Sequence, residues 1–350
     1  MALETIDLGE GVRVSRIAKG NWQLAERHGP VFDHDAALED MRAFVEAGVT
    51  LFDCADHYVG VEQLIGDFRR RHPGLASRLR VSTKLVPDND SLARLKKADL
   101  EKIVDTSLAR LGQERLDLVQ FHWWDYRVPG YVQAMLWLKE LQAAGKVRLL
   151  GTTNFDTGRL AEIVAAGVPV ATNQLQYSVL DRRPERGMAA FCAQKGIRLL
   201  CYGVLAGGFL SKKWLGAPAP AEPFANRSLI KYRLIIEEFG GWARFQDLLG
   251  VLDRIAAKHR VALASVAARF ILDKPGVAVL LLGARNAAHL PEMLEVLKVR
   301  LDDADRAAIT ALADTAPGPL GDCYDLERVE DGAHSRIMWK NQNTRGAGAR

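Results

Sequence analysis

Four polar side chains with complementary chemistry stand at or just after the ends of apolar, strand-like runs. Asp53 ends one run and Tyr58 follows it, Lys84 ends a second run, and His122 follows a third. If these runs are neighbouring parallel strands, the four side chains meet on one rim of one sheet. A carboxylate, a phenol, an ammonium and an imidazole together make a site that can donate a proton to an oxygen atom.

Tyr58 is the expected proton donor of this set. An unperturbed tyrosine has a pKa of about 10, and a neighbouring Lys84 ammonium should lower that pKa by favouring the phenolate. Asp53 would hold the ammonium in place, and His122 would offer a second hydrogen bond to the same substrate oxygen. Each residue alone is more often a surface or core group, but the four together favour catalysis. The expected reaction is protonation of a carbonyl oxygen as hydride reaches its carbon, or the reverse on an alcohol.

One pattern recurs along the chain and indicates alternating helices and strands. A helix-like segment ends at a glycine, which can take the left-handed conformation that closes a helix, and an apolar strand follows. Nearly continuous apolar strands are typical of a parallel sheet that is buried on both faces. The glycines of this pattern are Gly48, Gly112, Gly145, Gly167 and Gly196.

Eight such strands alternating with helices predict an α/β fold, the (β/α)8 TIM barrel. The expected strands are Val14–Lys19, Val49–Asp53, Arg80–Lys84, Leu116–His122, Val147–Gly151, Val170–Gln174, Ile197–Tyr202 and Val277–Leu282. A doubly wound sheet is the alternative, but no G-x-G-x-x-G turn follows the first strand. Residues 5–12 are expected to form an N-terminal β-hairpin that plugs the barrel. Residues 203–241 are expected to form a long functional loop after strand 7, before a helix that begins near Trp242.

The composition is that of a globular, soluble protein. The chain has 350 residues, of which 48% are hydrophobic, and its 47 basic and 43 acidic residues nearly balance, which favours neither a nucleic-acid nor a membrane partner. We expect one barrel domain over residues 1–337 and a flexible tail over residues 338–350. No export signal is visible, and four cysteines lack paired spacing, so a reduced, cytoplasmic protein is expected. The cysteines are Cys54, Cys192, Cys201 and Cys323.

The segment that contains Asp53 and Tyr58 resembles the signature region of the aldo-keto reductase family. It reads FDCADHYVGVEQLIG over residues 52–66, while STK ends at Lys84 and QFH ends at His122. The resemblance extends over nearly the whole chain. It implies a barrel that binds NADP(H) in an extended pose without a Rossmann motif, with these four residues as the catalytic tetrad. The implied activity is the nicotinamide-dependent interconversion of a small aldehyde or ketone and its alcohol.

The resemblance also implies cofactor-binding positions. The carboxamide of the nicotinamide would bind Thr153, Asn154 and Gln174, and its ring would stack on Tyr202. Backbone amides after Tyr202 would lie along the pyrophosphate, and Arg285 would hold the adenosine 2′-phosphate. The full set is Thr153, Asn154, Gln174, Tyr202, Gly203, Leu205, Gly207, Gly283, Arg285 and His289.

Departures from the family pattern leave alternatives open. Val59 replaces a usual glycine, and His289 and Met293 stand where an arginine or glutamine and an asparagine are common. NADP(H) is therefore the first expectation and NAD(H) the alternative. Two rival functions share the barrel: an aldolase with a Schiff base on Lys84, and a non-catalytic cofactor-sensing subunit.

An aromatic substrate mouth is also expected. Trp22, Trp123 and Trp124 would line it, and at least one of the adjacent pair should face the open rim. Such a mouth suits small or flat carbonyl compounds. We assign no metal ligands, and the sequence indicates no particular oligomeric state.

Overall fold

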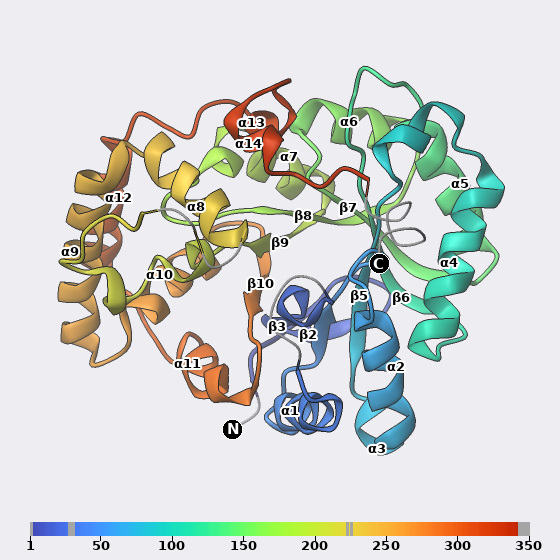
Figure 1. The fold of residues 1–350 in the computed structure, drawn as a ribbon, viewed down its shortest axis with the longest axis horizontal. Helices are drawn as coiled ribbons and strands as arrows, with labels where there is room; N and C mark the ends of the chain where they lie inside the picture. Colours follow the sequence, from blue (N-terminus) through green and yellow to red (C-terminus); the bar gives the residue numbers. More distant parts are fainter. Residues whose placement is uncertain (1–2, 27–31, 222–223, 225–226, 342–350) are drawn as a thin grey trace.

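The protein is described here by a computed structural model that covers residues 3–26, 32–221, 224 and 227–341. Eight parallel strands close into a barrel in the order β10-β3-β4-β5-β6-β7-β8-β9, and helices surround it (Figure 1). The (β/α)8 barrel predicted from the alternating pattern is therefore confirmed. The barrel strands are β3 (Ile17–Gly20), β4 (Leu51–Asp53), β5 (Arg80–Leu85), β6 (Leu116–Phe121), β7 (Val147–Thr153), β8 (Val170–Gln176), β9 (Arg198–Tyr202) and β10 (Val277–Gly283).

Helices connect the strands and bury one apolar face against them. In α4, for example, Leu100, Val104 and Leu111 recur at helical spacing and are buried. All five glycines predicted to end helices have positive φ, from 60° at Gly112 to 95° at Gly48, as a left-handed C-cap requires. The helices are α1 (His34–Glu46), α2 (Val61–Arg71), α3 (Pro73–Ala76), α4 (Lys97–Leu111), α5 (Tyr131–Ala143), α6 (Thr157–Ala165), α7 (Met188–Lys195), α8 (Arg227–Glu238), α9 (Gly241–His259), α10 (Leu263–Leu272), α11 (Leu290–Glu295), α12 (Asp303–Asp314), α13 (Asp325–Arg328) and α14 (Ala333–Arg336).

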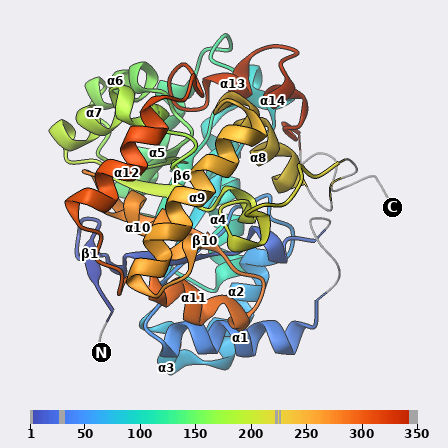
Figure 2. The ribbon, with the colours of Figure 1, turned by 90° about the vertical axis from the view of Figure 1, so that its left-hand side faces the viewer.

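The N-terminal hairpin is present but longer than predicted. It pairs β1 (Thr5–Asp7) with β2 (Arg13–Ser15), so Val14 faces Ile6 across the hairpin and does not begin the first barrel strand. The predicted boundary was wrong because an apolar residue such as Val14 fits either element. Leu8, Val12 and Val14 pack with residues of the barrel interior, and Figure 2 shows β1 on the side of the molecule opposite α8 and α14. The hairpin therefore plugs one end of the barrel and leaves the other end for a site.

The long connection after β9 contains a helix that the sequence analysis did not predict. Three apolar residues of α8 (Tyr232, Ile235 and Ile236) are buried, and their spacing of three and four residues was the missed helical signal. The next helix, α9, begins at Gly241, as expected near Trp242. Helix α8 packs against the segment that follows β9 and against α14, and so belongs to the rim of the barrel.

The first residues of the predicted tail are attached to the barrel. Asn89 N donates to the Lys340 carbonyl at 2.9 Å, and Asp90 N donates to Asn341 Oδ1 at 3.0 Å. Residues 342–350 lie outside the described residues. Among the residues that are described, no helix has the length and apolar character needed to cross a membrane.

The close contact between α2 and α4 depends on Gly66. A Cβ atom at this position would collide with the backbone carbonyl of Arg110 on α4. Because overpacking of this kind typically costs about 1–3 kcal/mol, Gly66→Ala should lower the free energy of unfolding in urea titrations. The matched control is Gly250→Ala in α9, where the nearest heavy atom is Arg254 Nη1 at 3.8 Å. Gly250→Ala should stabilise the protein by up to about 1 kcal/mol, because alanine has a higher helix propensity than glycine. If Gly66→Ala and Gly250→Ala changed the free energy of unfolding equally, the collision with Arg110 would not explain the need for Gly66.

Candidate active site

The carboxyl ends of β4, β5 and β6 bring the four predicted catalytic side chains to one rim. Asp53 is the last residue of β4 and pairs in register with Ser82, two residues before Lys84 in β5. His122 follows β6, and its backbone N–H donates to the Leu85 carbonyl of β5 at 3.1 Å. Tyr58 lies in the loop between β4 and α2. Neighbouring parallel strands with matched ends thus place the four side chains together, as expected.

A buried ion pair joins Asp53 and Lys84. The Lys84 ammonium is 2.6 Å from Asp53 Oδ2 and donates to the Cys54 carbonyl at 2.9 Å, and both ion-pair side chains are 8% exposed. Burial opposes the charged form of Lys84, but the Asp53 carboxylate and the Tyr58 phenol raise the pKa of Lys84 above its ordinary value. Lys84 is therefore a permanent ammonium at neutral pH.

The phenol of Tyr58 lies next to this ammonium. Lys84 Nζ is 4.9 Å from the centre of the Tyr58 ring, which also packs against Trp22 and His57 with centroid distances of 4.7 and 4.9 Å. The predicted lowering of the Tyr58 pKa is wrong in its net direction. Burial raises the pKa of Tyr58 by more than the charge and hydrogen bond of Lys84 lower it. Tyr58 is therefore protonated at neutral pH, and Lys84 limits the rise of its pKa.

His122 is a neutral imidazole with one nitrogen that forms no hydrogen bond with any described residue. Burial is the main cause that lowers the pKa of His122 well below its ordinary value, and the nearby charge of Arg328 lowers it further. Nδ1 lies 3.1 Å from the Thr153 carbonyl, which can only accept, so the single ring proton is assigned to Nδ1. Nε2 is buried and has no hydrogen-bond partner among the described residues. It consequently offers a lone pair to a bound molecule.

The residues predicted to bind the nicotinamide surround Asp53 and are bonded to one another. Asn154 has φ 63°, accepts a hydrogen bond from the Tyr202 hydroxyl at 2.7 Å, and donates its backbone N–H to the Gln174 carbonyl at 2.8 Å. Gln174 Nε2 donates to Asp53 Oδ1 at 2.7 Å. Thr153, at the end of β7, is buried and binds His122 through its carbonyl. The sequence analysis did not predict the contact of Gln174 with the ion pair.

The predicted pyrophosphate segment is covered by α8. Gly203 and Gly207 have φ of 69° and 63°, and added Cβ atoms would meet the Tyr232 hydroxyl at 2.5 Å and the Tyr232 ring at 2.7 Å, respectively. Leu205 lies between them in the same turn, which leads into a 3-10 segment over Ala206–Gly208. Glycine is required here both for the left-handed backbone and for the close approach of an aromatic ring.

The residues predicted to hold a 2′-phosphate lie together after β10. Gly283 ends β10, and the side chain of Gln23 packs directly against its Cα. Arg285 is half-buried and His289 is exposed. Asp40 on α1 accepts the backbone N–H of Ala287 at 2.9 Å, which fixes this segment to the barrel.

The three tryptophans differ in position. Trp22 packs on Tyr58, and Trp124 stands edge-on against His122 with a centroid distance of 4.3 Å. Trp123 is 1% exposed and donates its indole N–H to the carbonyls of Asp125 and Val128, both at 3.0 Å. Trp123 was wrongly predicted to line the mouth. Its ring faces the core because adjacent residues point to opposite faces.

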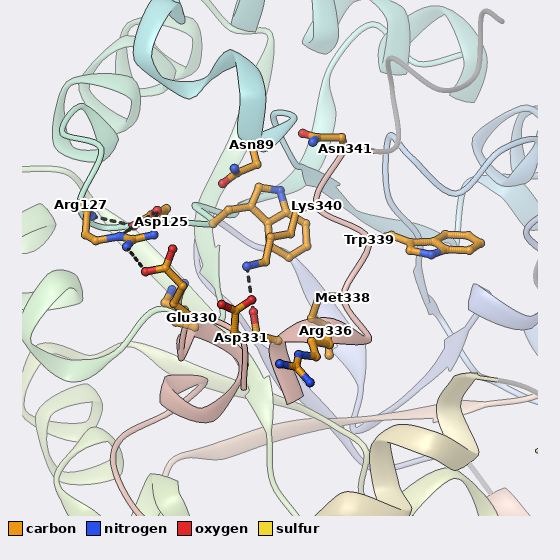
Figure 3. A pocket seen from close by; sticks show the side chains of 13 residues that line it. Asn89, Asp125, Arg127, Glu330, Asp331, Arg336, Met338, Trp339, Lys340 and Asn341 are labelled. Atoms are coloured by element: carbon orange, nitrogen blue, oxygen red, sulfur yellow. Dashed lines mark hydrogen bonds and ion pairs between the residues drawn. The ribbon is translucent and has the colours of Figure 1, made fainter. Parts of the chain in front are cut away.

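The C-terminal segment adds residues that the sequence analysis did not single out. The ring of Tyr324 is 5.6 Å from that of His122, and Arg328 donates to the Asn154 carbonyl at 2.9 Å. A cavity of about 460 Å³ opens beside Arg328 and Trp124, between the loop after β6 and the segment that includes α14. Figure 3 shows Arg127, Asp125 and Glu330 paired along its edge. No local motif marked Tyr324, Arg328 and Glu330, because they lie some 200 positions after His122 in the chain.

Lys231 from α8 also lies at this rim. Its Nζ is 5.0 Å from the ring centre of Tyr202 and 5.6 Å from that of Tyr324. The long connection after β9 was expected to be functional, and it brings this cation next to the predicted nicotinamide platform.

Comparisons with known proteins find matches over most of the chain. The family model described as Aldo/keto reductase family matches residues 16–314. YhdN, an aldo-keto reductase of Bacillus subtilis strain 168, is 29% identical over 321 residues, 89% of this chain and 94% of YhdN. The NADH-specific methylglyoxal reductase of Escherichia coli K12 is 24% identical over 342 residues, 89% of this chain and 99% of that protein.

A solved structure shares the fold. The glycerol dehydrogenase of Gluconobacter oxydans matches with a TM-score of 0.76 at 24% identity, over 92% of this chain and 98% of that chain. At this identity the likeness is one of architecture, and it places the chain among barrels of the same topology.

Proposed function

The chain belongs to the aldo-keto reductase family of oxidoreductases, and we propose that it interconverts a small aldehyde or ketone and its alcohol, with Tyr58 as the proton donor. The observation that carries this proposal is the presence of three groups at one rim of the barrel. The Lys84 ammonium lies 4.9 Å from the ring centre of the protonated Tyr58 phenol, and the buried Nε2 of His122 has no hydrogen-bond partner in the described part of the chain.

The proposed proton transfer uses groups that the barrel already positions. Tyr58 donates its hydroxyl proton to the carbonyl oxygen and becomes a phenolate, which Lys84 stabilises by its charge. Asp53 keeps Lys84 charged and fixed, and Gln174 fixes Asp53. Nε2 of His122 can accept a hydrogen bond from the hydroxyl of the alcohol form. In the direction of oxidation, the same groups remove the proton of the alcohol.

A nicotinamide cofactor would supply or accept the hydride. The residues around Tyr202 fit such a cofactor, because this half-buried aromatic ring lies beside the amides of Asn154 and Gln174 at the same rim as Tyr58. Gly203, Leu205 and Gly207 would hold the pyrophosphate through their backbone. Arg285 would bind the 2′-phosphate of NADP(H), our first choice over NAD(H), with Gly283 and His289 beside it.

The Schiff-base aldolase is disfavoured by the state of Lys84. An amine must be neutral to attack a carbonyl carbon, whereas the pKa of Lys84 is raised because Asp53 and Tyr58 outweigh the opposing effect of burial. A non-catalytic subunit would not need a complete proton-donating set. We further propose a cytoplasmic location, since four buried free cysteines suit a reducing compartment.

The direct test is a panel of small aldehydes and ketones, each assayed with NADPH and with NADH by the loss of cofactor absorbance. Turnover of several carbonyl compounds would support the proposal. Absence of turnover with both cofactors, in protein shown to bind one of them, would favour the non-catalytic alternative. Trapping with borohydride should label no lysine, and labelling of Lys84 would revive the aldolase.

The pH dependence of reduction follows from the pKa directions. Tyr58 is the donor when protonated, and its pKa is raised by burial, so activity should persist through neutral pH and fall only above about 10, the ordinary tyrosine range. His122 has a lowered pKa and stays neutral near pH 6.5, so its titration should cause no change there. We therefore expect a flat profile of kcat between about pH 6 and pH 9. A titration near pH 7 would contradict these assignments.

Cofactor preference should depend on Arg285. An arginine–phosphate pair is charge-assisted, so Arg285→Ala should weaken NADPH binding by roughly 10–100-fold and leave NADH binding almost unchanged. Quenching of protein fluorescence gives both dissociation constants. His289→Ala should also weaken NADPH binding, but by a smaller factor than Arg285→Ala. Equal losses for the two cofactors would show that Arg285 does not recognise the 2′-phosphate.

A further inference from the structure

Two cations lie beside His122 that the proposed proton transfer does not use. Lys231 comes from α8 and Arg328 from α13, and both charges act on His122 to lower its pKa, after burial. Both cations lie near the ring of Tyr324. Its ring centre is 5.6 Å from Lys231 Nζ, 4.9 Å from Arg328 Cζ and 5.6 Å from the His122 ring. Two positive charges thus lie close to a ring that contacts His122.

The side chain of Lys231 is only 14% exposed, and little negative charge lies near its ammonium to offset this burial. Its ion-pair partner is Glu327, at 3.6 Å, and the charge of Asp181 also favours the ammonium, less strongly than Glu327 does. Glu327 is shared, because its Oε2 is 3.1 Å from Arg183. Burial accordingly lowers the pKa of Lys231 in spite of Glu327. An additional anion at this position would stabilise the ammonium.

Arg328 is fixed at the same rim without a carboxylate partner in the described structure. Its guanidinium donates to the carbonyls of Asn154 and Trp123 at 2.9 and 2.8 Å and lies 4.1 Å from the ring centre of Tyr126. Its Nε is buried and has no hydrogen-bond partner. Carbonyl groups and aromatic rings orient a guanidinium without cancelling its charge, so Arg328 can still attract an anion.

The surrounding space has room for part of a ligand. Arg328 and Trp124 line the cavity of about 460 Å³, and Trp124 is in edge contact with His122. The acidic residues along this cavity are partly neutralised, since Asp125 and Glu330 both pair with Arg127 at 2.8 and 2.7 Å (Figure 3). The cavity is therefore lined mainly by polar residues, and Trp124 connects its wall to His122.

We propose that Lys231 and Arg328 form a subsite for an anionic group, a carboxylate or a phosphate, on the carbonyl substrate. This inference rests on the proposed function, because it assigns the substrate class of the same site. An anion beside Tyr324 would receive charge-assisted hydrogen bonds in a partly desolvated position. A neutral analogue of the same size would leave both cations without that partner.

The test compares charged and neutral carbonyl compounds of similar size. One pair is 4-formylbenzoate and its methyl ester, and the other is glyceraldehyde 3-phosphate and glyceraldehyde; the two pairs distinguish a carboxylate from a phosphate. We expect the wild type to prefer the charged member of at least one pair by roughly 10–100-fold in kcat/KM, mainly through KM. Lys231→Met should remove most of this preference, and Lys231→Arg should retain it.

The control is Lys212→Met, which removes an ammonium that is 78% exposed and pairs with Asp253 at 3.2 Å. It should leave the preference intact. The dissociation constant of the cofactor is measured for every variant, because Lys231 is also near Tyr202. The dissociation constant of the cofactor should change little in Lys231→Met. If cofactor affinity fell by as large a factor as the substrate preference, Lys231 would instead bind the cofactor phosphates, and the proposed subsite would be wrong.

Two further outcomes separate the inference from the function on which it rests. Turnover of all four compounds without preference for a charged member would contradict the subsite alone. A wild-type protein that reduces none of the aldehydes, in the panel or in these pairs, would contradict the proposed function and the subsite with it.

Discussion

Replacing Tyr58 with phenylalanine should reduce the turnover of carbonyl reduction by about 10²–10⁴-fold, the range that general acid catalysis typically supplies. The phenylalanine ring can keep the contacts with Trp22 and His57, whose ring centres are 4.7 and 4.9 Å from that of Tyr58. Only the hydroxyl is lost. Cofactor affinity and thermal stability should therefore remain close to those of the wild type, while single-turnover rates measured by cofactor absorbance fall.

A matched tyrosine outside the site serves as the control. Tyr131, the first residue of α5, donates its hydroxyl to Glu162 on α6. Tyr131→Phe should leave turnover near the wild-type level. If Tyr58→Phe retained full activity as well, the phenol would not be the proton donor and the assignment of the tetrad would be wrong.

Replacing Lys84 with methionine should have an effect at least as large. Lys84 is the group that lowers the pKa of Tyr58 against the opposing and larger effect of burial. Without the ammonium, the phenolate that forms on proton transfer has no nearby positive charge, and Asp53 is left as a buried, unpaired carboxylate. Removal of one partner of a buried pair typically costs about 3–5 kcal/mol of stability. Turnover and the unfolding midpoint should both fall.

A double variant separates catalysis from stability. In Asp53→Asn with Lys84→Met, the buried pair is neutral, so folding stability should recover relative to Lys84→Met while turnover stays low. Asp53→Asn alone should cause the smallest loss of turnover, because the charge of Lys84 remains and Gln174 can still bond the residue at position 53. Recovery of turnover in the double variant would mean that Lys84 acts only as the counter-ion of Asp53. A larger loss in Asp53→Asn than in Lys84→Met would reverse the proposed order of roles.

Local patterns in the sequence determined the barrel and the position of the candidate site. Glycines after helical segments indicate helix ends, because a left-handed cap favours glycine. Continuous apolar runs indicate strands that are buried on both faces, as in a parallel sheet. Since the strands are parallel, polar residues at successive strand ends must share one rim. Asp53 and Lys84 accordingly form an ion pair, and His122 directly follows β6, the strand next to that of Lys84. The helix α8 could also have been predicted from the spacing of Tyr232, Ile235 and Ile236, since that signal is local.

Only the tertiary structure decided the properties that depend on burial and on distant parts of the chain. The pKa of Tyr58 is raised, contrary to prediction, because desolvation outweighs the charge of Lys84. The residues adjacent to position 58 in the sequence do not determine how deeply Tyr58 is buried. The proton of His122 lies on Nδ1 because a carbonyl of β7 faces it. Lys231 and Arg328 reach the same rim from α8 and α13, more than 100 and 200 residues after His122. Chain folding alone determines such distances, so no spacing or periodicity near His122 could have indicated the two cations beside it.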